Sequence, residues 1–150
     1  MKNNNFVLKK FIEFMWKKYN TSICFISEEV NNKNILGEYI SYNKEKREKN
    51  KIIFVNLKNI DDEMIKIFVL FHEVGHFLLD KSSFIQKEEY ADFLGYYLLK
   101  EFYSREKNNI LSSKFVDKMN LTSIFLIEKN VKKDLIIIGK LFYHSYYNFF

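Results

Sequence analysis

Residues 72 to 76 read His72-Glu73-Val74-Gly75-His76 and include two of the three histidines in the chain. On a helix, residues four positions apart share a face, so His72 and His76 can direct both imidazoles at one metal ion, and zinc suits this geometry. Glu73 lies about 100° further round the helix and reaches toward the open side of the metal. Zinc lowers the pKa of a water bound there to about 7, and the carboxylate can pass its proton to a leaving amine. The motif therefore indicates peptide hydrolysis, with Zn²⁺ as cofactor and Glu73 as general base.

The helix that carries the motif is expected to begin at Asp61, Asp62 and Glu63, which are capping and dipole-complementing acids. Residues 64–71 are apolar almost without a break, which predicts a helix at the centre of the domain. A buried imidazole or carboxylate needs a partner, and a metal ion would supply one. Gly75 costs about 1 kcal/mol of helix stability relative to alanine, so we expect another backbone to approach closely there. The alternative is an amphipathic helix with solvated histidines at its edge.

A catalytic zinc site has three protein ligands and one open position, so a third His, Glu or Asp is required. A second helix is expected downstream, on which Glu88, Asp92 and Gly95 share one face with Ala91 beside them. Small residues let this helix lie close to the first, so that Glu88 can bind the metal while Asp92 accepts the spare N–H of a ligand histidine. Glu89 points about 100° away and is the weaker ligand candidate. The alternative for both glutamates is a solvated acidic helix terminus.

These two segments together carry a resemblance to a known family. Residues 72–79 read HEVGHFLL, and residues 88–92 read EEYAD, followed by Leu98-Leu99. This arrangement resembles the ImmA/IrrE family of zinc metallopeptidases, whose form is HExGHxLLH followed by ExEA(N/D)xFAxxLLMP. The resemblance is strong over residues 52–99 and weak elsewhere.

The resemblance implies that His72, His76 and Glu88 are zinc ligands, that Glu73 is the general base and that Asp92 braces a zinc histidine. The departures from the family pattern touch none of these positions, and they concern the substrate cleft and the end of the second helix. They are Tyr90, Leu94 and Gly95 on the second helix, Asp80 in place of the usual histidine, and Lys100-Glu101 in place of Met-Pro.

The resemblance further implies regulatory proteolysis, in which the peptidase cleaves a helix-turn-helix DNA-binding repressor, often within a mobile element or a stress response. The rival from another class is a non-catalytic regulatory or protein-interaction domain that keeps the metal as a clasp or sensor. A closed structural site has four protein ligands, so Asp92 or Glu89 at bonding distance would favour the rival. An open position beside Glu73 would favour the enzyme. A metal-free domain with a chance motif is a third reading.

Composition limits the class of protein. At 150 residues and 47% hydrophobic content, the chain can build one sizeable core, so we expect a single domain over residues 1–150. Cys24 is the only cysteine, which excludes a disulfide framework and a cysteine-based zinc site. The absence of a signal-peptide pattern and of a long apolar run predicts a cytoplasmic protein that does not span a membrane. The net charge of +5 is spread over mixed-sign clusters such as residues 44–51, so direct nucleic-acid binding is not expected.

The elements that position the motif follow from hydrophobic periodicity. We expect an α+β fold in which a small three-stranded antiparallel sheet packs on the metal helix and on the second ligand helix, with further helices at the C-terminus. Helices are predicted over residues 6–19, 86–99, 111–119, 121–129 and 134–147, strands over 22–26, 35–42 and 51–57, and turns at 31–34 and 43–50.

In peptidases of the resembled kind, the substrate lies extended along an edge strand beside the HExxH helix. The strand over residues 52–57 is the candidate for this strand addition, which makes Ile53, Phe54 and Val55 candidate substrate-binding residues. The alternative is an interior strand with no free edge.

Two further questions are left open by the sequence. Tyr90, Tyr96, Tyr97 and His144 are all candidates for the group that stabilises the oxyanion, and His144 is more simply read as a half-buried residue of a C-terminal helix. Residues 141–150 are densely aromatic and are expected to pack on the metal-helix pair, whereas exposed aromatics at their end would mark a partner or oligomer surface. The oligomeric state is not predicted.

Overall fold

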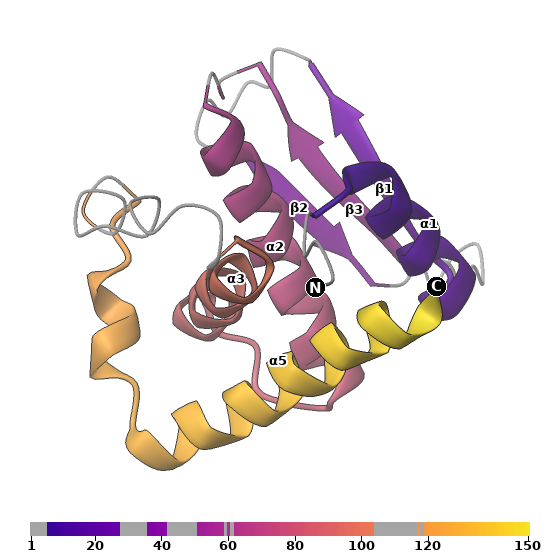
Figure 1. Cartoon of the computed structure of the whole chain (residues 1–150). Coiled ribbons are helices and arrows are strands. Elements are labelled where there is room, and N and C mark those ends of the chain that lie inside the picture. The colour runs from indigo at the N-terminus through magenta and orange to yellow at the C-terminus, as the bar shows by residue number, and fades with distance from the viewer. Residues whose placement is uncertain are drawn as a thin grey trace.

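The computed structural model of the chain describes residues 6–27, 36–41, 51–58, 60, 62–103, 117 and 119–150. Within these residues the chain has the α+β fold that the sequence predicts, with helices packed against a three-stranded sheet (Figure 1). In chain order, its elements are α1 (Leu8–Tyr19), β1 (Thr21–Ile26), β2 (Gly37–Ile40), β3 (Lys51–Asn56), α2 (Glu63–Lys81), α3 (Glu88–Tyr103), the 3₁₀ helix η1 (Thr122–Leu126) and α5 (Lys129–Phe149).

The sheet has the strand order β1-β3-β2 and is mixed. Strand β1 pairs parallel with β3, with Thr21 opposite Lys51, whereas β2 pairs antiparallel with β3, with Gly37 opposite Val55. The predicted all-antiparallel sheet is therefore wrong in one of its two pairs. The chain passes from β1 to the far edge, forms β2 there and returns as β3 between them. Periodicity identifies each strand but carries no information about which strands become neighbours.

Strand β3 lies in the centre of the sheet, so it cannot receive a substrate strand. Ile53 and Val55 are fully buried, and Phe54 faces the opposite side of the sheet. The prediction that Ile53, Phe54 and Val55 form a free edge for substrate is wrong, because β1 and β2 occupy both sides of β3. An apolar strand gives the same sequence signal at an edge as in the interior when one face is buried. The edge strand next to α2 is β2.

Helix α2 is the central element of the fold, as the sequence predicts. Asp62 caps its N-terminus, since the Asp62 carboxylate accepts hydrogen bonds from the backbone N–H groups of Met64 at 2.8 Å and Ile65 at 3.2 Å. Asp61 lies outside the described residues. The helix contacts β2 and β3 on one side and α3 on the other, which buries most of its length. Residues near its centre are thereby held between the sheet and α3.

Helices α2 and α3 approach each other to backbone contact. A Cβ atom placed on Gly75 would lie 2.8 Å from the carbonyl oxygen of Ala91, and one placed on Gly95 would lie 2.9 Å from the backbone nitrogen of His72. The close approach that was predicted from Gly75 is confirmed. Small residues on both helices therefore bring the start of α3 against the motif in α2.

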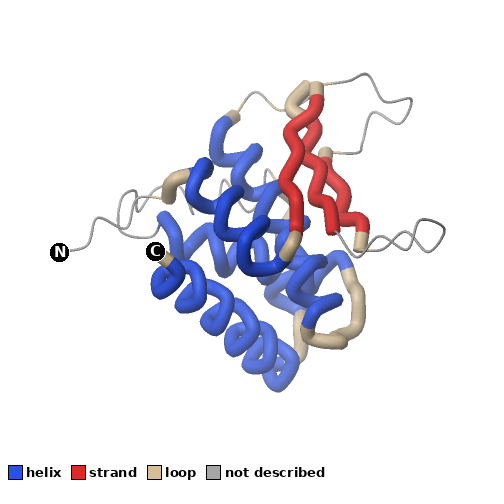
Figure 2. Tube along the Cα trace, turned by 90° about the vertical axis from the view of Figure 1, so that its right-hand side faces the viewer, coloured by secondary structure: helices blue, strands red, loops and turns tan. Residues whose placement is uncertain are grey.

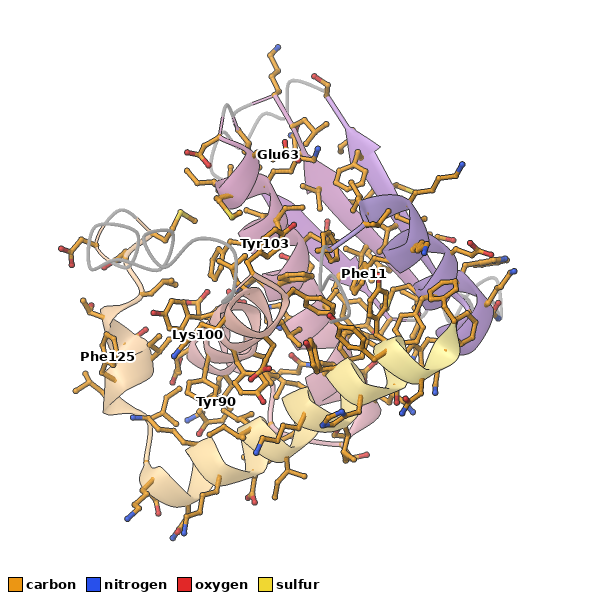
Figure 3. All side chains as sticks on the ribbon, viewed as in Figure 1. Phe11, Glu63, Tyr90, Lys100, Tyr103 and Phe125 are labelled. Atoms are coloured by element: carbon orange, nitrogen blue, oxygen red, sulfur yellow. The ribbon has the colours of Figure 1, made fainter. Side chains whose placement is uncertain are left out.

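The described helices lie on one side of the sheet, and an aromatic core fills the space between them (Figure 2). Phe11 is fully buried in this core, where α1 faces α5 (Figure 3). Its ring centroid lies 5.6 Å from that of Phe71 in α2 and 6.0 Å from that of Phe142 in α5. The second of these contacts joins α5 to α1, and α5 also packs against α3. The expected packing of the C-terminal aromatics on the metal-helix pair is met by Tyr143 and Tyr146, whose rings contact Phe102 of α3, whereas Phe150 is 56% exposed.

The C-terminal elements differ from the prediction in detail. Residues 121–129 form only the short η1, in which Ile124 is buried but Leu126 is 86% exposed, and α5 begins earlier than predicted, at Lys129. Asn120 has a left-handed backbone with φ 54°, which interrupts any helix that enters η1 from upstream. The turns predicted at 31–34 and 43–50 and most of the helix predicted at 111–119 lie outside the described residues. In the described part of the chain, no helix is both long and apolar enough to cross a membrane.

Candidate metal centre

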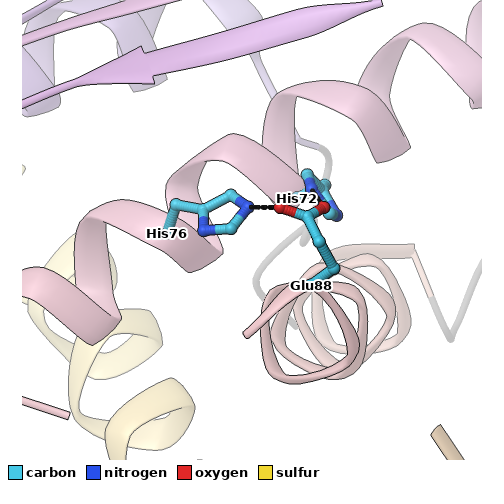
Figure 4. A group of neighbouring side chains, drawn as sticks. All are labelled: His72, His76 and Glu88. Atoms are coloured by element: carbon cyan, nitrogen blue, oxygen red, sulfur yellow. Dashed lines mark ion pairs between the residues drawn. The ribbon is translucent and has the colours of Figure 1, made fainter. Parts of the chain in front are cut away.

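His72, His76 and Glu88 converge where the first turn of α3 meets the middle of α2 (Figure 4). His72 Nε2 lies 3.1 Å from one carboxylate oxygen of Glu88, and His76 Nε2 lies 3.0 Å from the other. One donor atom from each residue lies within 4.8 Å of the other two, so the three residues could hold a metal ion. The structure therefore brings together the three ligand candidates that lie 4 and 12 residues apart in the chain.

The donor set and its spacing fit a small transition-metal ion. Zinc binds histidine nitrogen and carboxylate oxygen at about 2.0–2.2 Å, so neighbouring donors of a tetrahedral site lie about 3.3 Å apart. The separations of 3.1 and 3.0 Å, which run from the two imidazole nitrogens to different oxygens of Glu88, are each close to that value. The two histidine side chains are 14% and 16% exposed, whereas that of Glu88 is 76% exposed. Glu88 thus approaches the imidazoles from the solvent side.

His72 is oriented by Asp92. The Nδ1 atom of His72 lies 2.7 Å from the Asp92 carboxylate, which can only accept when ionised, so Nδ1 carries the hydrogen and Nε2 presents its lone pair. Burial lowers the pKa of His72, but the hydrogen bond and charge of Asp92, with the charges of Glu73 and Glu88, raise that pKa above its ordinary value. Asp92 therefore increases the basicity of a candidate ligand, as carboxylates beside metal-binding histidines do.

His76 is oriented by Gln86, a residue that the sequence did not single out. The Gln86 side-chain nitrogen donates to the backbone carbonyl of His76 at 2.9 Å, and the Gln86 oxygen lies 2.8 Å from His76 Nδ1. A carbonyl can only accept, so the amide orientation is fixed, and Nδ1 of His76 must carry the hydrogen. His76 Nε2 is therefore also left with its lone pair toward Glu88. Gln86 lies in the short linker before α3, where an exposed glutamine gives no sequence signal of its own.

Glu73 is a buried carboxylate beside the ligand histidines. It is 6% exposed, and its carboxylate lies 3.9 Å from His72 Nε2. Burial raises the pKa of Glu73, the charges of His72 and His76 lower it, and those of Glu88 and Glu38 raise it, with a net pKa above the ordinary value. The carboxyl group is thus placed next to the ligand atoms but outside the ligand group itself.

A cavity of about 650 Å³ opens between the edge strand β2 and the two ligand helices. Glu73 and the three ligand candidates line it, and so do Gly37 and Tyr39 of β2. Gly37 permits the strand to pass close to α2, because a Cβ atom there would lie 2.9 Å from Val69 and 3.1 Å from Cγ of Glu73. The cavity therefore joins the candidate metal centre to the edge of the sheet.

Other candidates lie away from this cavity. Tyr90, Tyr96, Tyr97 and His144 are not among its lining residues, and Glu89 is not part of the ligand group. His144 is exposed on α5.

The tyrosine that does line the cavity is Tyr39, whose hydroxyl donates to Asp80 at 2.7 Å. Burial, with the hydrogen bond and charge of Asp80, holds the pKa of Tyr39 well above its ordinary value. The sequence did not indicate Tyr39, since its place beside α2 depends on the strand order.

Comparisons of the chain with protein-family models, with curated proteins and with solved structures find no match. The fold and the geometry of the site define a class, an α+β protein in which two histidines and a glutamate could hold a metal ion. The similarity of its motifs to the ImmA/IrrE peptidases stays an expectation from the sequence. Function must therefore be inferred from the site.

Proposed function

We propose that the chain is a zinc-dependent endopeptidase. The observation that carries this proposal is the placement of the buried Glu73 carboxylate beside a His72-His76-Glu88 group whose donor atoms lie within 4.8 Å of one another. Three ligands leave one position open, which is the arrangement of catalytic rather than structural zinc sites. The cavity against this group provides room for a substrate.

The chemistry divides between the metal and the chain. Zinc held by these ligands would polarise a substrate carbonyl and lower the pKa of water in the open position to about 7. Glu73 takes the proton of the attacking water at its carboxylate and delivers it to the nitrogen of the leaving amine. Burial raises the pKa of Glu73 toward neutrality, where a group that must act first as base and then as acid works best.

Ligand orientation is supplied by the chain. Asp92 and Gln86 hold the Nδ1–H groups of His72 and His76, so that both Nε2 atoms face the same point. A rotated imidazole would present N–H instead of a lone pair and could not bind a metal. These two hydrogen-bond partners therefore orient both imidazoles for metal binding in the metal-free protein.

The substrate segment is proposed to lie along β2. As the edge strand of the described sheet, β2 presents unpaired backbone groups on the side away from β3, and Gly37, Glu38 and Tyr39 line the cavity. An extended peptide that pairs with this edge would run past Glu73, because Gly37 lies against that residue. This position replaces the one that the sequence suggested on β3.

The resemblance to ImmA/IrrE peptidases suggests a cellular role and a substrate for the proposed peptidase. It supports regulatory proteolysis in the cytoplasm, with a helix-turn-helix DNA-binding repressor as the protein substrate and a mobile element or stress response as the setting. The support for this substrate is the pair of motifs around His72 and Glu88. The cavity geometry supports peptide hydrolysis independently of it.

The rival reading, a non-catalytic domain with a closed metal site, needs a fourth protein ligand. Asp92 is the nearest further carboxylate, but it lies on the Nδ1 side of His72, away from Nε2. Within the described residues the ligand group contains no fourth member. These contacts favour the open site of an enzyme.

The proposal is tested by metal content and peptide cleavage measured together. Protein purified without chelator is expected to contain about one zinc per chain and to cleave peptides from a proteome-derived library, as detected by mass spectrometry. Removal of zinc with a chelator should abolish cleavage, and added zinc should restore it. Protein that binds zinc and cleaves neither peptides nor intact helix-turn-helix repressors would support the rival. Protein that binds no zinc would refute the site.

A further inference from the structure

The wall of the cavity is acidic in a basic protein. The chain carries a net charge of +5, with 24 Lys and Arg against 19 Asp and Glu. The cavity is nevertheless lined by Glu38, Glu73, Asp80, Glu88 and Asp92, and among the residues that the structure describes no lysine or arginine lines it. The negative charge of the cavity lining therefore does not follow from the composition of the chain. It is a local property of this surface.

A bound divalent metal ion does not make the cavity lining positive. Two of the five carboxylate charges are offset by the metal, while the histidines bind as neutral imidazoles. The cavity then retains a negative charge, and partly enclosed walls concentrate its potential on whatever enters. Glu73 marks the cavity as a ligand site apart from this charge, because its side chain is 8% exposed and it accepts no hydrogen bond from the described residues.

Two of the acids have no part in the metal chemistry. Asp80 lies one turn beyond His76 on α2, and the Tyr39 hydroxyl holds one of its oxygens at 2.7 Å. Glu38 precedes Tyr39 on the edge strand, and its charge acts on Glu73. Asp80 is exposed and is fixed by one contact, which leaves lone pairs for a donor from a bound molecule.

The contacts of β2 show how far Asp80 lies from Glu73 along the cavity. Gly37 lies against Glu73, and Tyr39, two residues further along β2, lies against Asp80. Two strand residues span about 6.8 Å. A substrate strand that pairs with β2 therefore brings a side chain one or two positions from the cleaved bond to Asp80. A lysine or arginine there would meet a carboxylate, with the Tyr39 ring beside its stem.

We propose that this cleft selects substrates with a lysine or arginine within two residues of the cleaved bond, and that Asp80 is the specificity-determining residue. This inference rests on the proposed peptidase function. Tyr39 acts as the positioning residue, because its hydroxyl fixes the carboxylate of Asp80 in the direction of the cavity. The substrate class is thus a basic segment of a protein chain.

The test is a cleavage profile of the zinc-loaded protein on a proteome-derived peptide library. Lysine and arginine should be enriched roughly fivefold at one position within two residues of the cleaved bond, a preference set by one partly exposed charge pair. Asp80→Asn should remove most of the enrichment and Asp80→Lys should shift the preference to Asp and Glu. Tyr39→Phe should weaken the enrichment without reversing it. Asp134→Asn, which removes an exposed carboxylate from α5, should leave the profile unchanged.

The outcomes separate this inference from the proposed function. Cleavage without enrichment of basic residues, or enrichment that survives Asp80→Asn, would overturn the inference and leave the peptidase intact. Absence of cleavage would overturn the peptidase, and matched peptides with Lys or Gln at a single position would then test the cleft by binding to the zinc-loaded protein. Roughly fivefold tighter binding of the Lys peptide, lost in Asp80→Asn, supports the acidic cleft. Equal binding refutes it.

Discussion

Gly95 of α3 lies directly against the backbone of His72 in α2. A Cβ atom at Gly95 would lie 2.9 Å from the nitrogen and 3.0 Å from the Cα atom of His72. Because Asp92 and Glu88 extend from the same helix toward the same histidine, this contact sets the distance over which both carboxylates must reach. The missing side chain of one glycine is therefore a condition for the candidate metal centre.

Gly95→Ala should destabilise the protein although alanine is the better helix former. The gain of about 1 kcal/mol in helix propensity is outweighed by separation of two packed backbones, with an expected net loss of about 1–3 kcal/mol. Urea unfolding measures this loss. Gly139→Ala is the comparison in which an added Cβ meets a side chain rather than a backbone, because the atoms nearest to a Cβ there belong to the Tyr97 ring. Gly95→Ala with unchanged stability and zinc affinity would contradict the packing.

Glu88→Ala should weaken zinc binding far more than Glu89→Ala. Glu88 places one carboxylate oxygen 3.1 Å from His72 Nε2 and the other 3.0 Å from His76 Nε2, whereas Glu89 belongs to the same helix turn but not to the ligand group. Loss of a direct ligand should exceed the 10-fold to 100-fold cost of losing an outer partner, so we expect a loss of more than about 100-fold. Titration against a competing chelator measures both affinities. The reverse order would move the third ligand by one residue.

Gln86→Ala should weaken zinc binding about tenfold, because His76 loses the acceptor that fixes its ring. Gln86→Glu places a carboxylate on the same Nδ1–H and should restore binding in part, although it cannot donate to the His76 carbonyl. Lys87→Ala, at the exposed neighbouring position, serves as control. The same chelator titration applies. Equal affinity in Gln86→Ala and Lys87→Ala would show that Gln86 does not orient the ligand.

Tyr97→Phe should stabilise the protein, and most of all at high pH. The Tyr97 hydroxyl is buried and lacks a well-formed hydrogen bond among the described residues, since Glu101 reaches it only weakly, so its removal should raise stability by up to about 1 kcal/mol at neutral pH. Burial, with the charge of Glu101 and a weak side-chain hydrogen bond to it, raises the pKa of Tyr97 to about 12. The folded state thus favours the neutral form of Tyr97. The stability of the wild-type protein is therefore unaffected by this titration below about pH 10, and it falls as pH rises toward 12.

Unfolding free energies measured between about pH 8 and 12 test this sign. The wild-type protein should lose stability above about pH 10 more steeply than Tyr97→Phe does. Glu101→Gln should give an intermediate slope, because it removes only the charge that adds to the effect of burial. Parallel curves for wild type and Tyr97→Phe would mean that Tyr97 does not titrate differently in the folded and unfolded states.

The sequence could predict those features of the site that depend on the spacing of residues along one helix. The positions of His72, Glu73 and His76 on one helix follow from 3.6-residue periodicity, and Asp62 caps that helix as its residue type suggests. The closeness of the second helix followed from Gly75 and from the small residues opposite it. Helical geometry fixes the first two of these relations over four or five residues without reference to the rest of the fold.

What the sequence could not predict depends on strand order and on side-chain reach. The apolar pattern of β3 does not indicate which strands lie beside it, so the sequence suggests an edge there, whereas the cavity is lined by β2. The sequence gives no signal for Gln86, because its role requires the linker to fold back on His76. The Tyr39–Asp80 hydrogen bond joins residues 41 positions apart, beyond any local pattern.

The most direct test of the central claim is the comparison of wild type with Glu73→Gln. Glutamine preserves the size of the side chain and removes the proton-accepting carboxylate, and Glu73 is not one of the three ligand candidates. Zinc content and peptide cleavage are measured on the same two preparations. We predict about one zinc per chain in both proteins and cleavage only in the wild type, with a loss of at least about 100-fold in the variant. Equal cleavage by the two proteins would contradict the assignment of Glu73 as the general base.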